Sequence, residues 1–130
     1  MYLIDSDILV YLDRGRVNIQ ERMYQAGITN CFVSEISLAE LYMGAYKSGD
    51  AKMLSFLTYV EKKLGILPIS SVIPIYAKLR ARLELQGNRL DNMDLFIAAT
   101  ALANDCTLVT HNTRHFARIP GLRLEDWVEE

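Results

Sequence analysis

The stretch DNMDLFIAATAL, residues 91–102, is the segment that indicates the fold of this chain most clearly. Apolar side chains recur there at helical spacing, at Leu95, Ala98 and Leu102, and acids occupy the first turn, as the helix dipole favours. The alanines leave little side chain on several faces, which predicts a helix that lies close against a sheet. Asp94 stands in the first turn beside the apolar face. A single acid so placed more often serves only as a cap or dipole partner, so a chemical role for Asp94 requires oxygen ligands from other elements.

Size and composition are those of one ordinary globular domain. The chain has 130 residues, 51% of them hydrophobic and 23% charged, which predicts a single domain spanning residues 1–130. A net charge of -2 excludes a surface that is basic all round, so any nucleic acid must bind to a local basic patch. Cys31 and Cys106 lie far apart in apolar segments, which favours core thiols in a reducing compartment over a zinc site. Asp5 and Asp7 interrupt the apolar start, and no apolar run approaches a membrane span, so we expect a cytoplasmic protein.

Short apolar strands alternate with helical segments along the chain. The predicted strands are residues 2–4, 31–33, 66–69, 107–110 and 122–124, and the predicted helices are residues 8–12, 17–26, 34–47, 51–64, 71–86 and 91–102. This alternation predicts a parallel sheet covered by helices on both faces. Pro68 indicates that the third strand lies at an edge of the sheet.

Local patterns predict how several helices begin and which faces they bury. Small polar residues offer helix caps at Ser6 or Asp7, Asp50 and Ser71. The expected buried stripe of helix 34–47 is Ile36, Ala39, Met43 and Tyr46. Tyr42, Tyr46 and Tyr59 have apolar neighbours, which favours the core or an interface with a partner helix over base stacking.

Polar side chains gather where the predicted strands end. Asp5 follows the first strand directly, Asn112 follows the fourth by two residues, and Asp94 begins the helix that leads into the fourth. In an open parallel sheet, ligands collect at the carboxyl ends of strands, near the point where strand order reverses. If the first and fourth strands are neighbours, these three residues share one rim, and Glu40 in the helix after the second strand can reach it.

The position of Glu40 allows two interpretations. It lies beside the apolar stripe of its own helix, and a carboxylate turned towards a core costs several kcal/mol, roughly, without a compensating partner. Ser37 and Glu40 also fit the S-x-x-E capping box, which would satisfy a helix start and nothing more. Taken alone, the residues leave both readings open.

Taken together, the acids favour a metal site. Carboxylates that share a rim raise one another's pKa, and a hard divalent cation removes that repulsion and prefers oxygen ligands. Magnesium keeps several waters, can acidify one as a nucleophile, and can neutralise charge that builds on a phosphate. The pattern therefore predicts hydrolysis of a phosphodiester by an in-line water.

Four stretches resemble the PIN-domain ribonucleases, and among them the VapC toxins of bacterial and archaeal toxin–antitoxin pairs. They are LIDSDILVYL (3–12), SEISLAELYMG (34–44), DNMDLFIAATAL (91–102) and LVTHNTRHFARIPGLRLEDW (108–127). The resemblance implies a three-layer α/β/α sandwich with a central parallel sheet, and Mg²⁺ or Mn²⁺ bound by acids. It implies cleavage of RNA, commonly tRNA or rRNA. It also implies a homodimer and a cognate VapB-like antitoxin whose tail covers the active site.

The resemblance carries over to individual positions. Asp5, Glu40 and Asp94 match the three most regular acids of the family. Asn112 stands where many relatives have Asp and others Asn, so a fourth charge is lost, and Asn112 ligates the metal directly, ligates it through water, or orients Asp5.

Three further residues complete the expected site. Ser6 and Thr110 resemble family residues that donate hydrogen bonds to the metal ligands. Asp91 either compensates for the lost charge or, as is more common for such an acid, caps its helix.

Basic residues cluster in sequence around the proposed rim. They are Arg89, His111, Arg114, His115 and Arg118, and together they offer charges and forks for RNA phosphates. For any single one of them a solvated surface position is the commoner case. The two histidines lie four residues apart without an HExxH frame, which argues against a zinc site.

Two other functions compete with the ribonuclease. Asp5–Ser6–Asp7 at a strand end resembles the DxD opening of haloacid-dehalogenase-like phosphatases, but the lysine and acidic pair of that aspartyl-phosphate chemistry find no convincing frame here. A catalytically weak RNA-binding module would arise if Asn112 weakened the metal. Release of phosphate without RNA cleavage would favour the first alternative, and RNA protection without cleavage the second.

Overall fold

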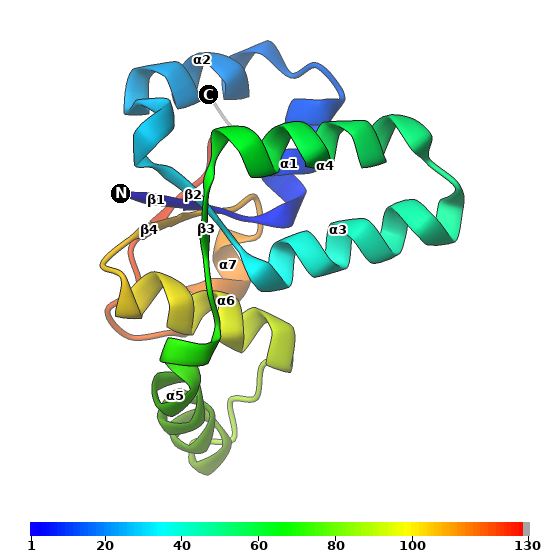
Figure 1. The fold of residues 1–130 in the computed structure, drawn as a ribbon. Coiled ribbons are helices and arrows are strands. Elements are labelled where there is room, and N and C mark those ends of the chain that lie inside the picture. The colour runs from blue at the N-terminus through cyan, green and yellow to red at the C-terminus, as the bar shows by residue number, and fades with distance from the viewer. Residues whose placement is uncertain (129–130) are drawn as a thin grey trace.

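The computed structural model describes residues 1–128, which form a parallel sheet with helices packed around it (Figure 1). The strands are β1 (Tyr2–Ile4), β2 (Cys31–Ser34), β3 (Gly65–Leu67), β4 (Thr107–Val109) and β5 (Leu124–Glu125). The α-helices are α1 (Ser6–Asp13), α2 (Val17–Ala26), α3 (Glu35–Ser48), α4 (Ala51–Lys63), α5 (Ile73–Leu85), α6 (Asn92–Ala103) and α7 (Thr113–Phe116). Across residues 1–128, none of the helices combines the length and apolarity needed to span a bilayer.

The sheet has five parallel strands in the order β3-β2-β1-β4-β5. The chain builds outward from β1 to β3 on one side and then crosses over to place β4 and β5 on the other. The strand order therefore reverses between β1 and β4, and Ile4 pairs with Val109 at their carboxyl ends. The predicted α/β fold with a parallel sheet is confirmed, and the first and fourth strands are neighbours, as the predicted rim requires.

Alternating strand residues divide the core into two layers. Ile4 and Val109 pack into a cluster with side chains from α1 to α4, whereas Leu3 and Leu108 pack against α5 and α6. Figure 1 shows these two groups of helices on opposite sides of the sheet. The result is the predicted three-layer α/β/α sandwich, because both faces of a parallel sheet are apolar and need cover. Cys31 and Cys106 are buried thiols, as predicted. Cys31 lies in the cluster with α1 to α4, and Cys106 in the cluster with α5 and α6.

The edge strand β3 differs slightly from the prediction. It lies at the edge, as Pro68 indicates, but it covers Gly65–Leu67 and ends one residue before Pro68. Gly65 pairs with Phe32, and a Cβ at Gly65 would lie 2.5 Å from the Phe32 ring. The strand therefore begins at a residue without a side chain. At the opposite edge, β5 begins at Leu124, two residues later than predicted.

Two of the predicted helix caps are wrong. Asp5, rather than Ser6 or Asp7, is the N-cap of α1, and its carboxylate accepts the Ser6 N–H at 2.8 Å. Ser71 does not cap α5, because a 3-10 turn at Ser70–Val72 precedes the helix. Asp50 caps α4 as predicted, by accepting the Met53 N–H at 3.0 Å.

The predicted buried face of α3 is wrong. Met43 and Tyr46 are 60% and 71% exposed, and Tyr59 on α4 is 54% exposed, so neither tyrosine belongs to the core. The side chains that α3 buries are Ser37, Leu38, Leu41 and Ala45. Both sets repeat at helical spacing, and periodicity alone does not decide which of two apolar stripes faces the sheet.

Candidate active site

Asp5 lies at the centre of the rim, where β1 ends and α1 begins. It is 7% exposed, and its backbone N–H donates to the carbonyl of Val109 on β4 at 2.9 Å. One carboxylate oxygen accepts the Ser6 N–H, and the other accepts the Thr110 hydroxyl at 2.9 Å. Burial, and then the nearby carboxylate of Asp7, raise the pKa of Asp5 to about 7 despite these hydrogen bonds. Such a group in the folded chain resists charging unless a cation is close.

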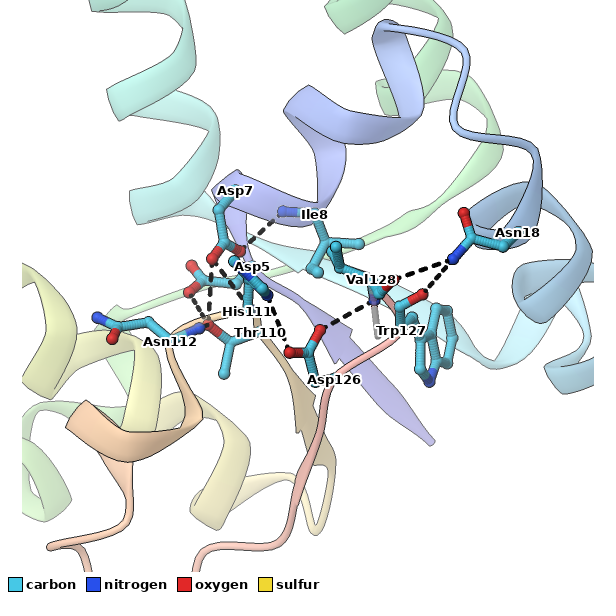
Figure 2. Close-up of polar contacts among 10 residues, drawn as sticks. All are labelled: Asp5, Asp7, Ile8, Asn18, Thr110, His111, Asn112, Asp126, Trp127 and Val128. Atoms are coloured by element: carbon cyan, nitrogen blue, oxygen red, sulfur yellow. Dashed lines mark hydrogen bonds and ion pairs between the residues drawn. The ribbon is translucent and has the colours of Figure 1, made fainter. Parts of the chain in front are cut away.

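Thr110 connects Asp5 to Asn112. Its side chain is fully buried, and the same hydroxyl that donates to Asp5 accepts the Asn112 N–H at 3.1 Å. Figure 2 shows this relay between the ends of β1 and β4. Thr110 thus donates a hydrogen bond to one of the predicted ligands, and its role in supporting a bound metal stays a prediction. Asn112 is exposed and reaches Asp5 only through its backbone and Thr110, so whether its side chain ligates an ion stays a prediction.

Asp7 lies beside Asp5 at the rim, although the sequence indicated it only as a helix cap or as part of a DxD pattern. Its carboxylate accepts the backbone N–H groups of Ile8 at 2.7 Å and His111 at 3.0 Å (Figure 2). Burial is the main cause that raises the pKa of Asp7, and its charge in turn raises that of Asp5. Its position two residues after Asp5 was the available signal. Asp7 holds the segment after β4 against α1.

His111 is partly exposed to solvent and also contacts the C-terminal segment. Its Nδ1 lies 2.9 Å from Asp126 Oδ2 (Figure 2). Its ring also packs edge-on against Tyr11. An RNA phosphate that contacted His111, as predicted, would therefore compete with Asp126 for the His111 ring.

Asp94 enters the rim from α6. It lies in the first turn, as predicted, and its Oδ2 is 2.9 Å from His115 Nε2. The charge of Asp94 also contributes to raising the pKa values of Asp5 and Glu40. Asp94, on α6, therefore shares one electrostatic environment with the two other predicted acids, Asp5 before α1 and Glu40 on α3.

Glu40 is half-buried on α3, and the capping-box reading of it is wrong. Ser34 is the N-cap of α3 and accepts the Ile36 N–H at 3.0 Å. Ser37 lies inside the helix, fully buried, and its hydroxyl has no hydrogen-bond partner among residues 1–128. Burial first, then Asp94 and Asp91, raise the pKa of Glu40. Asp91 is the N-cap residue of α6, but its side chain makes no capping hydrogen bond, so its charge is free to act on Glu40.

The donor set fits a hard divalent cation in its chemistry. Asp5, Glu40 and Asp94 are carboxylates, the charge of Asp94 raises the pKa of the other two, and such ligands suit Mg²⁺ or Mn²⁺. As they stand, no three Asp, Glu, His or Cys side chains of residues 1–128 converge closely enough to hold an ion. Instead, a carboxylate oxygen of Asp5 is hydrogen-bonded to Thr110, and one of Asp94 is hydrogen-bonded to His115. An ion would have to draw the carboxylates together, and their ligation of one ion stays a prediction.

The basic residues near the rim are partly engaged. Arg89 is exposed and lies 3.6 Å from Glu84, while Arg118 donates to Asn88 Oδ1 and to the Arg89 carbonyl. Arg114 is exposed on α7. Their contact with RNA stays a prediction.

The family model of the PIN domain matches residues 2–122 of this chain. The chain belongs to the PIN-domain family.

This PIN domain is similar over nearly its whole length to VapC proteins. It is 35% identical over 131 residues to Ribonuclease VapC2 of Rickettsia felis, covering 98% of each chain. It is 32% identical over 133 residues to Ribonuclease VapC1 of Haemophilus influenzae, covering 99% of each. The resemblance to VapC ribonucleases is confirmed.

Solved structures agree with the sequence comparison. The PIN domain superposes on VapBC2 from Rickettsia felis bound to a DNA fragment from their promoter with a TM-score of 0.87, at 34% identity, covering 97% of this chain and 98% of that one. For VapBC-1 from nontypeable Haemophilus influenzae the TM-score is 0.86, at 32% identity, covering 98% of both chains.

Proposed function

We propose that this PIN domain is the ribonuclease toxin of a VapBC-type toxin–antitoxin pair and hydrolyses RNA phosphodiester bonds with Mg²⁺ or Mn²⁺. The observation that carries the proposal is Asp5, a buried carboxylate with its pKa raised to about 7, which Thr110 fixes at the β1–β4 switch point. Relatives named ribonuclease VapC match the chain over nearly its full length, which supports an endoribonuclease. They also favour RNA cleavage over a phosphatase or an inactive binding module.

The proposed division of labour follows from the contacts. Asp5, Glu40 and Asp94 would hold the ion, with Asn112 contributing directly or through water. When bound, the ion supplies an acidified water and neutralises charge on the phosphate. Thr110 keeps one Asp5 oxygen fixed, and the Ser6 N–H fixes the other, while the predicted donation by the Ser6 hydroxyl stays a prediction.

The partners follow from the relatives and the basic residues. The similar structures are VapBC complexes, which supports a VapB-like antitoxin as partner. We expect a homodimer and an RNA substrate, tRNA or rRNA. Arg89, Arg114 and His111 would contact its phosphates.

Cleavage of a labelled RNA by the purified chain tests the proposal. We expect cleavage with Mg²⁺ or Mn²⁺, none in EDTA, and a loss of about 100-fold or more in Asp94→Asn, because a metal ligand is replaced. Asp105→Asn is the matched control, since Asp105 is exposed and paired with Arg123. Equal cleavage by the wild type in EDTA would show the metal mechanism to be wrong, and release of phosphate from a small ester without RNA cleavage would support a phosphatase.

A further inference from the structure

His115 and Asp94 form a close pair at the rim. His115 Nε2 lies 2.9 Å from Asp94 Oδ2, and the two side chains are 25% and 29% exposed, so a small ion can reach them from solvent. Both are anchored by buried neighbours: Asp94 precedes the core residue Leu95, and the His115 ring packs edge-on against the buried ring of Phe116. The pair therefore presents one oxygen and one nitrogen from two different helices at a defined separation.

The distance of 2.9 Å between His115 Nε2 and Asp94 Oδ2 fits a hydrogen bond, and it also fits two atoms that bind the same metal ion. Neighbouring ligand atoms around an octahedral ion with bonds near 2.1 Å lie about 3 Å apart. The neutral imidazole has one nitrogen without a proton, and that nitrogen can bind a metal. It adds no negative charge to a rim where carboxylates already raise the pKa values of Asp5 and Glu40.

We propose that His115 is a nitrogen ligand of the same metal ion that Asp94 binds, and that this ligand gives the site a preference for Mn²⁺ over Mg²⁺. The inference rests on the proposed metal-dependent function and adds to it a ligand and a choice of metal. The physical reason is that both ions bind carboxylates, but Mg²⁺ takes oxygen ligands almost exclusively, whereas Mn²⁺, a first-row transition-metal ion, also accepts an imidazole nitrogen. Metal binding replaces the hydrogen bond between Asp94 and His115, so Nε2 carries no proton when it ligates the ion, and the one proton of the neutral ring then lies on Nδ1.

Pulsed electron paramagnetic resonance of bound Mn²⁺ tests the ligand directly, because a coordinated imidazole nitrogen modulates the electron spin echo. We expect ¹⁴N modulation in the wild type, its loss in His115→Gln, and its persistence in His111→Gln. His111 is the matched control, since its ring bonds Asp126 and not a proposed ligand. Labelling histidine with ¹⁵N in the wild-type chain must change the modulation, which gives a test that needs no variant to fold.

Titration calorimetry with Mn²⁺ and Mg²⁺ tests the preference. His115→Gln should weaken Mn²⁺ binding about 10-fold or more and Mg²⁺ binding by no more than about 3-fold, as expected for loss of a nitrogen ligand. An equal loss for both ions would show that His115 only positions Asp94, and an unchanged affinity or an echo without nitrogen modulation would also overturn the inference. These results would leave the ribonuclease proposal standing, since carboxylates alone can bind the ion, whereas cleavage in EDTA would defeat that proposal separately.

Discussion

Thr110 Oγ1 donates a 2.9 Å hydrogen bond to Asp5 Oδ2, although the two residues lie 105 positions apart in sequence. The bond joins the ends of β1 and β4 at the point where the strand order reverses. Because the same hydroxyl accepts the Asn112 N–H, one side chain orients a buried carboxylate and the loop that enters α7. The geometry at Asp5 therefore depends on Thr110.

Thr110→Val should remove this support while preserving side-chain shape. The second Asp5 oxygen would lose its donor in a buried position, so we expect metal affinity and RNA cleavage to fall about 10- to 100-fold, the usual range for residues that orient metal ligands. Calorimetric metal titration and cleavage assays measure both. Thr110→Ser keeps the hydroxyl and should retain most of the activity. Wild-type metal affinity in the valine variant would show that Asp5 needs no such donor.

The raised pKa of Asp5 predicts a pH-dependent stability of the metal-free chain. The folded state holds the Asp5 proton up to about pH 7, whereas the unfolded value is 3.8. The stabilisation is complete below the unfolded pKa and is lost as the pH rises through the folded pKa. In EDTA we expect this group to make the wild type about 2–4 kcal/mol less stable near pH 7.5 than at mildly acidic pH, which urea unfolding measures.

Asp5→Asn gives the matched comparison for that pH dependence. The amide cannot ionise, so the variant should lose most of the slope and be more stable than the wild type near neutral pH without metal. Asp7 and Glu40 also have raised pKa values and will leave a smaller slope in the same direction. An unchanged slope in Asp5→Asn would place the titration on another group.

Ser37→Ala should be neutral or stabilising. The Ser37 hydroxyl is fully buried without a hydrogen-bond partner among the described residues, so its removal relieves a desolvation cost of about 1 kcal/mol. Thermal unfolding would then show an unchanged or higher Tm. Ser34→Ala is the contrast, because that hydroxyl caps α3 and its loss should cost about 1 kcal/mol. A clear fall in Tm for Ser37→Ala would reveal a partner for the hydroxyl, such as an ordered water.

Trp127→Ala should destabilise the whole domain. The Trp127 ring is 1% exposed, its Nε1 donates to Glu125 at 2.9 Å, and Arg22 lies over the ring at 5.5 Å. Truncation of such a side chain costs about 3–5 kcal/mol because it leaves a cavity. Trp127→Phe should cost less, since it keeps most of the apolar volume. A loss below about 1 kcal/mol in the alanine variant, measured by urea unfolding, would mean that the C-terminal segment contributes little to the fold.

Local patterns in the sequence were enough for the alternation of strands and helices, the helix of residues 91–102, and the edge position of the strand before Pro68. They also placed Asp5 directly after β1 and Asp94 in the first turn of α6. These features depend on neighbours in the chain, through helical spacing, strand length and the restricted backbone of proline. The same patterns did not predict the short helix α7, which covers only Thr113–Phe116.

Only the tertiary structure decided which distant groups meet. Parallel pairing of β1 with β4 brings Thr110 to Asp5, and the packing of α7 beside α6 brings His115 to Asp94. It also decided that α3 buries Leu38 and not Met43. Periodicity defines the spacing of a stripe but not its partner, and that partner is chosen by burial of apolar surface contributed by residues far apart in the chain.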